Sequence, residues 1–193
     1  PPAMAPVKVV VIPIQQRKEG VIEKAQEIAG KLKDLRVKVD DTDRSPGFKF
    51  AEQEMRGFPV RVEIGPKDIE AGQCVVVRRD TREKYTVALD EAETFITKML
   101  DTIQNDMYEK AKKHLDSCIY EAHTYDEFKD IMSNRQGFAK AMWCGDEACE
   151  DQIKADTTAT SRCMPFDDQK PVSDKCICCG RPAKHLVYWG KSY

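Results

Sequence analysis

The sequence predicts an α/β chain, in which a five-stranded mixed sheet with three flanking helices is followed by a small α+β domain. Three observations lead to this fold class. Residues 7–39 read as strand, amphipathic helix and strand, and residues 90–122 keep one long stripe of apolar side chains at helical spacing. Six of the eight cysteines lie within the last fifty residues. The chain therefore divides into two domains, expected over residues 1–105 and 106–193.

The first domain begins with a crossover unit. Residues 7–14 read VKVVVIPI, an apolar, β-branched run that is typical of a strand covered on both faces. Residues 18–35 place apolar side chains at helical spacing, and Val37 and Val39 begin a second strand. Strand, helix and strand in about 35 residues predict two parallel strands joined by a helix.

In the next segment, residues 45–68, the spacing of the apolar side chains changes halfway from that of a helix to that of a strand. Its first half predicts a short helix, ended by Gly57, in which Phe50 and Glu54 share one face. The side chains expected to cover a core on the neighbouring face are Phe48, Ala51 and Met55. From Phe58 the period is two, so that one side of a strand carries only apolar side chains and the other carries Arg61 and Glu63. The apolar side consists of Val60, Val62 and Ile64.

This helix and strand offer an aromatic ring, a carboxylate and a guanidinium on their uncovered side. Such groups suit the edge of an unstacked nucleic-acid base, because a ring stacks on it, a carboxylate accepts its N–H groups and arginine donates to its acceptors. Periodicity alone favours the more ordinary alternative, in which Phe50 widens the apolar stripe and Glu54 and Arg61 form a solvated ion pair.

Two strands at residues 74–77 and 85–88 complete the first sheet, and a long helix follows them. It is expected over residues 90–122, with Asp90 and Glu93 at capping positions. A helix of some thirty residues spans about 45 Å, enough to connect two domains. The second domain is expected to contain helices near 126–133 and 146–156 and strands near 138–143, 161–166 and 184–188.

Charge and hydropathy restrict the possible partners. The chain has 31 basic and 33 acidic residues, and therefore no bulk positive charge of the kind that holds duplex DNA. Residues 44–84 carry nine basic and seven acidic side chains, so RNA would bind locally there. No apolar run approaches the roughly 20 residues of a membrane span, and no signal peptide is recognisable. We expect a soluble, cytoplasmic protein without membrane or DNA partners.

The cysteines of the second domain have the spacing of a metal site. Cys144 and Cys149 form one pair, and Cys176 and Cys179 form another of the C-x2-C type. Glycine follows a cysteine in both segments, and tight turns let neighbouring sulfurs converge on a tetrahedral ion. The pattern predicts structural zinc, with unpaired thiols or a redox pair as alternatives. Cys178 is an alternative fourth ligand.

We expect no catalytic residues in this chain. The three histidines are isolated, and Gly-rich phosphate loops, nucleophile elbows and paired carboxylates with supporting context are not recognisable.

Several motifs, in order and spacing, resemble one family over essentially the whole chain. They are PPAMAPVKVVVIP, SPGFKFAEQE, GFPVRVEIGPKD, VVVRRDT, EAET, WCGDEACED, CMPF, CGRPAK and the terminal WGKSY. They are similar to the anticodon-binding and C-terminal zinc-binding domains of prolyl-tRNA synthetases of the archaeal/eukaryote-like class II type. Two departures are that both C-x-C and C-x2-C spacings occur here, and that Ala3 stands where many members carry arginine.

The resemblance implies a class II anticodon-binding fold in which Phe50, Glu54, Arg61 and Lys67 face the anticodon. It implies zinc ligands at Cys144, at Cys149 and in the CICC cluster. It further implies that tRNA(Pro) and a catalytic domain are partners, that ATP and magnesium bind only to that catalytic domain, and that the parent enzyme is a homodimer. Tyr193 is expected to turn toward the catalytic domain.

Two other functions stay open. One is a free-standing RNA-binding or regulatory module with a structural zinc, and the other is a zinc-stabilised interaction domain without a role in RNA binding.

Overall fold

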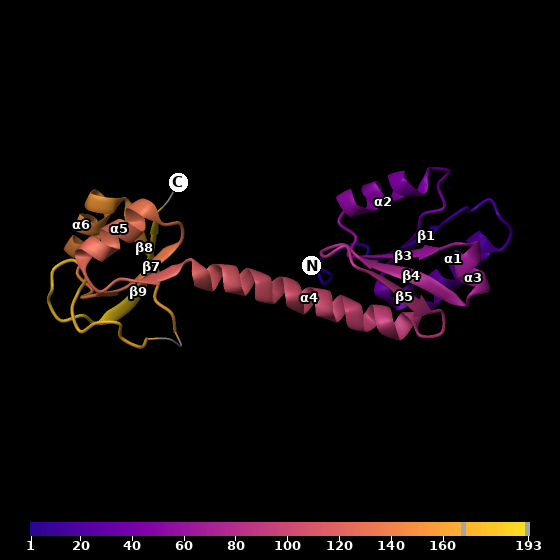
Figure 1. Cartoon of the computed structure of the whole chain (residues 1–193). Coiled ribbons are helices and arrows are strands. Elements are labelled where there is room, and N and C mark those ends of the chain that lie inside the picture. Colours follow the sequence, from indigo (N-terminus) through magenta and orange to yellow (C-terminus); the bar gives the residue numbers. More distant parts are fainter. Residues whose placement is uncertain (167–168, 192–193) are drawn as a thin grey trace. The chain divides into compact units, whose positions relative to one another are not determined.

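The computed structural model describes residues 1–166 and 169–191 (Figure 1). Tyr193, for which a role was expected, lies outside the described residues. The chain forms two compact units, Pro1–Glu109 and Lys110–Tyr193. No helix in the described part of the chain is both long and apolar enough to cross a membrane.

The first unit contains the predicted five-stranded mixed sheet, in the order β2-β1-β3-β4-β5. β1 (Val9–Pro13) pairs in parallel with β2 (Val37–Val39) and with β3 (Val60–Ile64). β4 (Gln73–Arg78) and β5 (Lys84–Ala88) continue the sheet antiparallel. The crossover from β1 through α1 (Val21–Lys31) to β2, followed by a short 3-10 turn at Lys33–Leu35, matches the sequence prediction.

The core lies on one face of this sheet, between the strands and helices α1 and α4 (Ala92–Ser117). Val60, Val62 and Ile64 are fully buried in it, as the alternation of β3 predicted. A short helix that the sequence analysis missed, α3 (Pro66–Glu70), packs Ile69 against the same core. Pro66 begins this helix, because its fixed φ suits a first helical turn.

Helix α2 (Pro46–Met55) lies over the other face of the sheet (Figure 1), and its buried side is not the predicted one. Phe48 and Met55, which were expected to cover a core, are 48% and 84% exposed. Lys49 and Gln53 are buried instead. The prediction was wrong because polar partners for these two side chains come from another part of the chain.

The long helix is shorter than predicted. α4 ends at Ser117, and residues 119–121 form strand β6 (Ile119–Glu121), which pairs in parallel with β7 (Phe138–Trp143). The apolar stripe continues through this segment, but Ile119 and Tyr120 are residues that favour strands. The amide of Phe138 donates to the carbonyl of Cys118 at 2.8 Å, which fixes the start of this pairing.

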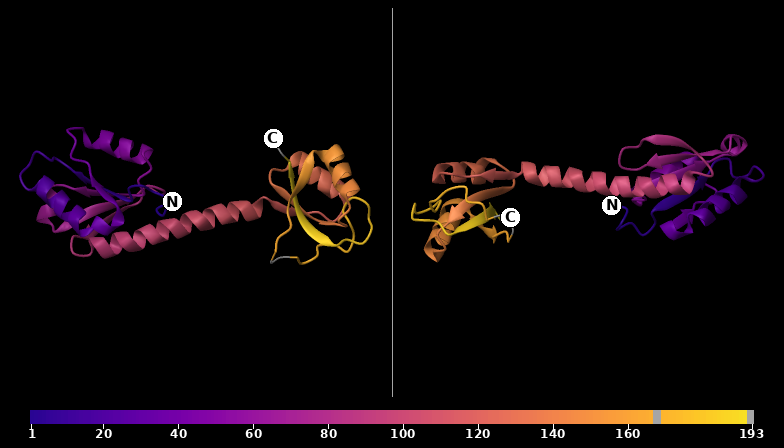
Figure 2. Two further views of the ribbon diagram at one scale, coloured as in Figure 1. Left: turned by 180° about the vertical axis from the view of Figure 1, so that it is seen from behind. Right: turned by 90° about the horizontal axis from the view of Figure 1, so that it is seen from below.

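The second unit has a four-stranded sheet in the order β6-β7-β9-β8. Strands β8 (Ala159–Cys163) and β9 (His185–Lys191) are offset from the predicted 161–166 and 184–188. Helices α5 (Tyr125–Asn134) and α6 (Glu147–Thr157) pack side by side on one face of the sheet, as the views in Figure 2 show. The core between them holds Phe128, Ile153 and Trp189, all fully buried.

Candidate nucleic-acid interface and metal centre

Three of the four residues expected to recognise RNA converge between β3 and α2. The guanidinium carbon of Arg61 lies 4.1 Å from the centre of the Phe50 ring. Arg61 Nη1 donates to Glu54 Oε1 at 3.1 Å, and Arg61 Nε donates to Glu63 Oε1 at 2.9 Å. The Arg61 side chain is only 10% exposed, whereas that of Glu54 is 35% exposed. The ion pair therefore exists, but it lies under the helix and is not solvated at its arginine end.

The hollow among these side chains is small. It is lined by Gln53, Glu54, Phe58, Arg61 and Arg79, with Val10 and Val77 at its base, and its volume is about 10 Å³. That space admits about one water molecule. A nucleic-acid base does not fit beneath the helix, so it would have to meet Phe50, Glu54 and Arg61 from the open side.

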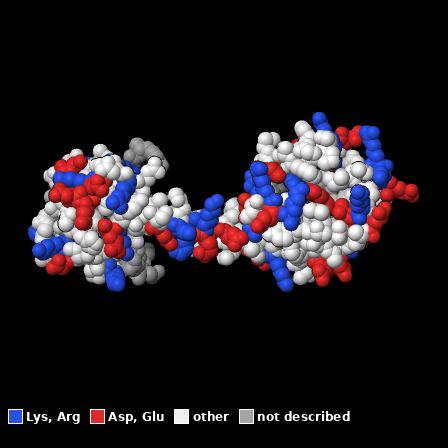
Figure 3. All heavy atoms as spheres, in the orientation of Figure 1, with Lys and Arg blue, Asp and Glu red and all other residues white. Residues whose placement is uncertain are grey.

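The hairpin between β4 and β5 adds basic groups that the sequence analysis did not single out. Arg79 Nε donates to the Glu54 main-chain oxygen at 2.7 Å, and Arg82 Nη2 lies 3.9 Å from Glu54 Oε2. Lys84 Nζ lies 3.8 Å from Glu63 Oε2. Residues 78–84, between the two predicted strands, read RRDTREK, and their density of basic residues was a usable signal. In the view of Figure 3, acidic and basic side chains are interspersed over this unit, as expected from its balanced charge.

Lys67, the fourth expected RNA contact, lies apart from the other three. It is exposed on α3, whose Ile69 packs against the opposite face of the sheet from α2. Over the residues that the structure describes, no recorded hydrogen bond or ion pair joins Lys67 to Phe50, Glu54 or Arg61.

Four cysteines meet in the second unit. The sulfurs of Cys144, Cys149, Cys176 and Cys179 all lie within 4.8 Å of one another. Sγ of Cys144 is 3.7 Å from that of Cys149 and 3.9 Å from that of Cys179. A tetrahedral ion with metal–sulfur bonds of about 2.3 Å holds its ligand atoms about 3.8 Å apart. The group therefore has the donors and the spacing of a four-coordinate metal site.

Tight turns bring these sulfurs together. Gly145 and Gly180 each follow a cysteine and have φ angles of +88° and +69°, a conformation that glycine adopts without a steric penalty. Cys178, the alternative fourth ligand, is not in this group, and its side chain packs against the neighbouring apolar residues. Cys163 is also outside the group, exposed at the end of β8.

Arg181 supports the thiolate form of one cysteine. Its Nε donates to Cys179 Sγ at 3.2 Å, and its Nη2 donates to Asp146 Oδ2 at 2.5 Å. The hydrogen bond from Arg181 lowers the pKa of Cys179 to about 6. Burial raises the pKa of Cys149 and Cys176. A cation would reverse that effect, because metal ligation requires deprotonated sulfur.

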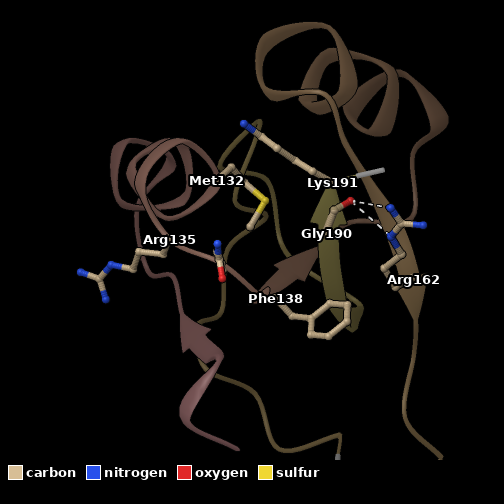
Figure 4. Close-up of a pocket in the computed structure, with 8 residues that line it drawn as sticks. Met132, Arg135, Phe138, Arg162, Gly190 and Lys191 are labelled. Carbon is tan, nitrogen blue, oxygen red and sulfur yellow. Dashed lines mark hydrogen bonds between the residues drawn. The ribbon is translucent and has the colours of Figure 1, made fainter. Parts of the chain in front are cut away.

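A larger hollow of about 870 Å³ lies in the second unit (Figure 4). In it, Arg162 donates through Nε and Nη2 to the Gly190 oxygen, at 3.2 and 3.1 Å. The labelled side chains of Arg135 and Lys191 extend away from Arg162 (Figure 4). These cationic groups do not converge on one point, unlike the polar groups of a small-molecule site.

Comparison with known proteins covers both units. Residues 8–99 match the family model described as an anticodon binding domain, and residues 125–193 match the one described as the C-terminal part of prolyl-tRNA synthetase. The chain is 63% identical over 195 residues to the proline–tRNA ligase of Lachnospira eligens and 61% identical over 194 residues to that of Agathobacter rectalis. It is 58% identical to that of Clostridium botulinum. Each alignment covers 100% of this chain and 40% of the relative.

Proposed function

Because the chain belongs to the prolyl-tRNA synthetase family, whose anticodon-binding and C-terminal domains it carries, we propose that it selects tRNA(Pro) for a proline–tRNA ligase. The single observation that supports this role most directly is the convergence of Phe50, Glu54 and Arg61 between β3 and α2. The chain spans about 40% of the length of these relatives. Proline activation with ATP and magnesium is assigned to the remaining part of the parent enzyme.

In the proposed recognition, a base of the anticodon replaces carboxylate partners of Arg61. In the free protein, Glu54 and Glu63 accept its N–H groups. A guanine of the anticodon offers N–H donors to Glu54 and two acceptors to Arg61, and its ring can stack on Phe50. A base with a different pattern of donors and acceptors would leave either Glu54 or Arg61 without a partner after their ion pair opens. An unpaired, partly buried polar group is costly. Lys67, lying apart, is assigned to a phosphate of the same RNA.

We further propose that the cysteine group holds zinc. Four thiolates suit zinc, and a set of four protein ligands leaves no open position for a water molecule. The ion would offset half of the negative charge of the thiolates of Cys144, Cys149, Cys176 and Cys179, and it would hold their two turns together. Its role would therefore be structural.

The parent enzyme is proposed to be a cytoplasmic homodimer, in which this chain's partners are tRNA(Pro) and the catalytic domain. These assignments rest on membership of the family.

Prediction one concerns the choice of tRNA. Two transcripts that differ only in the anticodon, one of them cognate for proline, are titrated with the full chain at one fixed salt concentration. We expect tighter binding of the cognate transcript, and Arg61→Ala should reduce this discrimination by about 1–3 kcal/mol.

The matched control is Arg56→Ala. Arg56 lies at the end of α2, the helix that carries Phe50 and Glu54, and pairs with Glu52. We expect Arg56→Ala to weaken the binding of both transcripts equally, as the loss of one positive charge does. Unchanged discrimination in Arg61→Ala would show that these three residues do not read the anticodon.

A further inference from the structure

Helix α2 is attached to the sheet by polar side chains. On its inner side Lys49 is 1% exposed and Gln53 is 3% exposed. No residue of α2 belongs to the hydrophobic clusters found among the described residues. Apolar packing, which holds most surface helices in place, therefore does not determine where this helix lies.

Asp40 is the partner that holds the inner side of α2. Lys49 Nζ donates to the main-chain oxygen of Asp40 at 2.8 Å and to Gln16 Oε1 at 2.7 Å. Gln53 Nε2 donates to Asp40 Oδ2 at 2.6 Å. Asp40 is itself fixed, because its amide donates to Val11 on β1 at 2.9 Å. We call Asp40, Lys49 and Gln53 the polar lock.

The ionised state of Asp40 suits this arrangement. Burial opposes ionisation of its carboxyl, but hydrogen bonds from Thr42 and Gln53 outweigh burial, and the pKa of Asp40 is lowered. The Asp40 side chain therefore remains an acceptor of hydrogen bonds at neutral pH.

The polar lock determines the rotation of the helix about its own axis. Lys49 and Gln53 are four residues apart and thus on one face. Phe50 and Glu54 are the residues that follow them, and the same rotation turns these two toward Arg61. Buried polar groups keep their partners because an unpaired group in the interior is costly. A small turn or slide of α2 would separate both pairs of the lock at once.

We propose that Asp40, Lys49 and Gln53 are positioning residues that orient Phe50 and Glu54 for reading an RNA base. They touch no RNA themselves and act through the helix. This inference rests on the proposed function, since it assigns to the polar lock a role in discrimination between tRNAs.

Prediction two tests the polar lock with Lys49→Met in the full chain. Methionine keeps the buried apolar stem but removes the amine. With the same pair of transcripts, the discrimination ratio should fall by about five- to 150-fold, as for loss of a base contact. Hydrogen exchange should accelerate in α2 and remain slow in β1 and β3. The matched control is Lys98→Met, at an exposed lysine of α4, which should leave the ratio and the exchange of α2 unchanged.

A second variant guards against loss of the fold. Gln53→Leu removes the amide bound to Asp40 and also removes Gln53 Oε1, a buried acceptor without a partner among the described residues. If hydrogen exchange in Lys49→Met becomes fast in β1 and β3, that variant has lost its fold, and Gln53→Leu is used in its place for the test. If both variants unfold the sheet, the lock holds the whole domain and the proposal is overturned.

A double-mutant cycle separates the inference on the polar lock from the proposal that Arg61 reads the anticodon. Because the lock acts through the groups that meet Arg61, Lys49→Met should have little further effect on discrimination in Arg61→Ala. Additive effects would overturn the proposal, as would full discrimination in folded Lys49→Met and Gln53→Leu. If Arg61→Ala itself retains discrimination, the proposed function fails, and the exchange of α2 still decides whether the lock holds the helix.

Discussion

Arg61 has two carboxylates and an aromatic ring as partners within the chain. Its guanidinium is thereby held in one place, and little of its side-chain entropy remains to be lost on binding. In the proposed recognition, the same contacts would partly open when a base binds. Affinity at this residue is consequently a difference between two sets of hydrogen bonds, which suits discrimination better than tight binding.

Another arginine, Arg78 on β4, has a stabilising role, and it provides prediction three. It donates to Asp80 at 2.6 Å and to Asp106 of α4 at 2.8 Å. The hydrogen bond from Arg78 lowers the pKa of Asp80 from its ordinary value of 3.8. Above pH 3.8 the folded state gains the full stabilisation, and the gain is lost as the pH falls through the lowered pKa.

The variant Asp80→Asn tests this pH dependence. We expect the wild type to be more stable than Asp80→Asn at neutral pH, with the difference shrinking on acidification below pH 3.8. Unfolding by urea is measured on β4 by hydrogen exchange, since both tryptophans lie in the other unit. A difference that stays constant with pH contradicts the assignment.

At the residue scale, local spacing predicted the group of Phe50, Glu54 and Arg61. Strand alternation and the four-residue helical period are both short-range, so the sequence contains them directly. Lys49 could not be found in this way. Its partner Asp40 comes from a separate strand end, and lysine is normally a surface residue.

At the scale of elements, α2 shows how a helix can be recognised while its orientation is mistaken. Its boundaries follow from Ser45, whose side chain caps the first turn, and from Gly57, which has a φ of +81°. Its inner face does not follow from an apolar pattern. The same limit explains α3 and β6, since a five-residue helix and a three-residue strand are too short to show a period.

Prediction four tests the orientation of α2 by stability. Met55 is 84% exposed, so Met55→Lys should change the free energy of unfolding by no more than about 0.5 kcal/mol. Were Met55 a core residue, as its spacing suggested, loss of its apolar contacts would cost about 2–5 kcal/mol. Chemical denaturation followed by hydrogen exchange in α2 and β1 distinguishes the two values.

At the scale of the whole molecule, the two units have separate hydrophobic cores. The predicted sheet of the first unit was found because its strands are short and rich in β-branched residues, in a nearly continuous apolar run in β1 and in an alternating pattern in β3. In the second unit, the prediction of a metal site depended on cysteine spacing and on the resemblance to a family, and not on any pattern of secondary structure. Spacing favoured Cys179 as the fourth ligand but left Cys178 as an alternative, because spacing carries no information on side-chain direction. In the structure the sulfur of Cys179, and not that of Cys178, lies with the other three.

Prediction five concerns metal removal. The purified full chain should contain about one equivalent of zinc, and a strong chelator should unfold the second unit. Trp143 and Trp189 both lie there, so their fluorescence reports the loss, while slow hydrogen exchange in β1 and β3 shows that the first unit persists. Cys179→Ser should lose the metal and Cys178→Ser should retain it. Metal-free protein with native fluorescence contradicts a structural role.

The polar lock beneath α2 also has a consequence for redesign of the protein. The outward-facing residues of α2 can be substituted without disturbing the hydrophobic core, provided that Asp40, Lys49 and Gln53 are left in place. A library confined to the solvent side of the ten-residue helix α2 would therefore be a compact starting point for altering the anticodon preference proposed above.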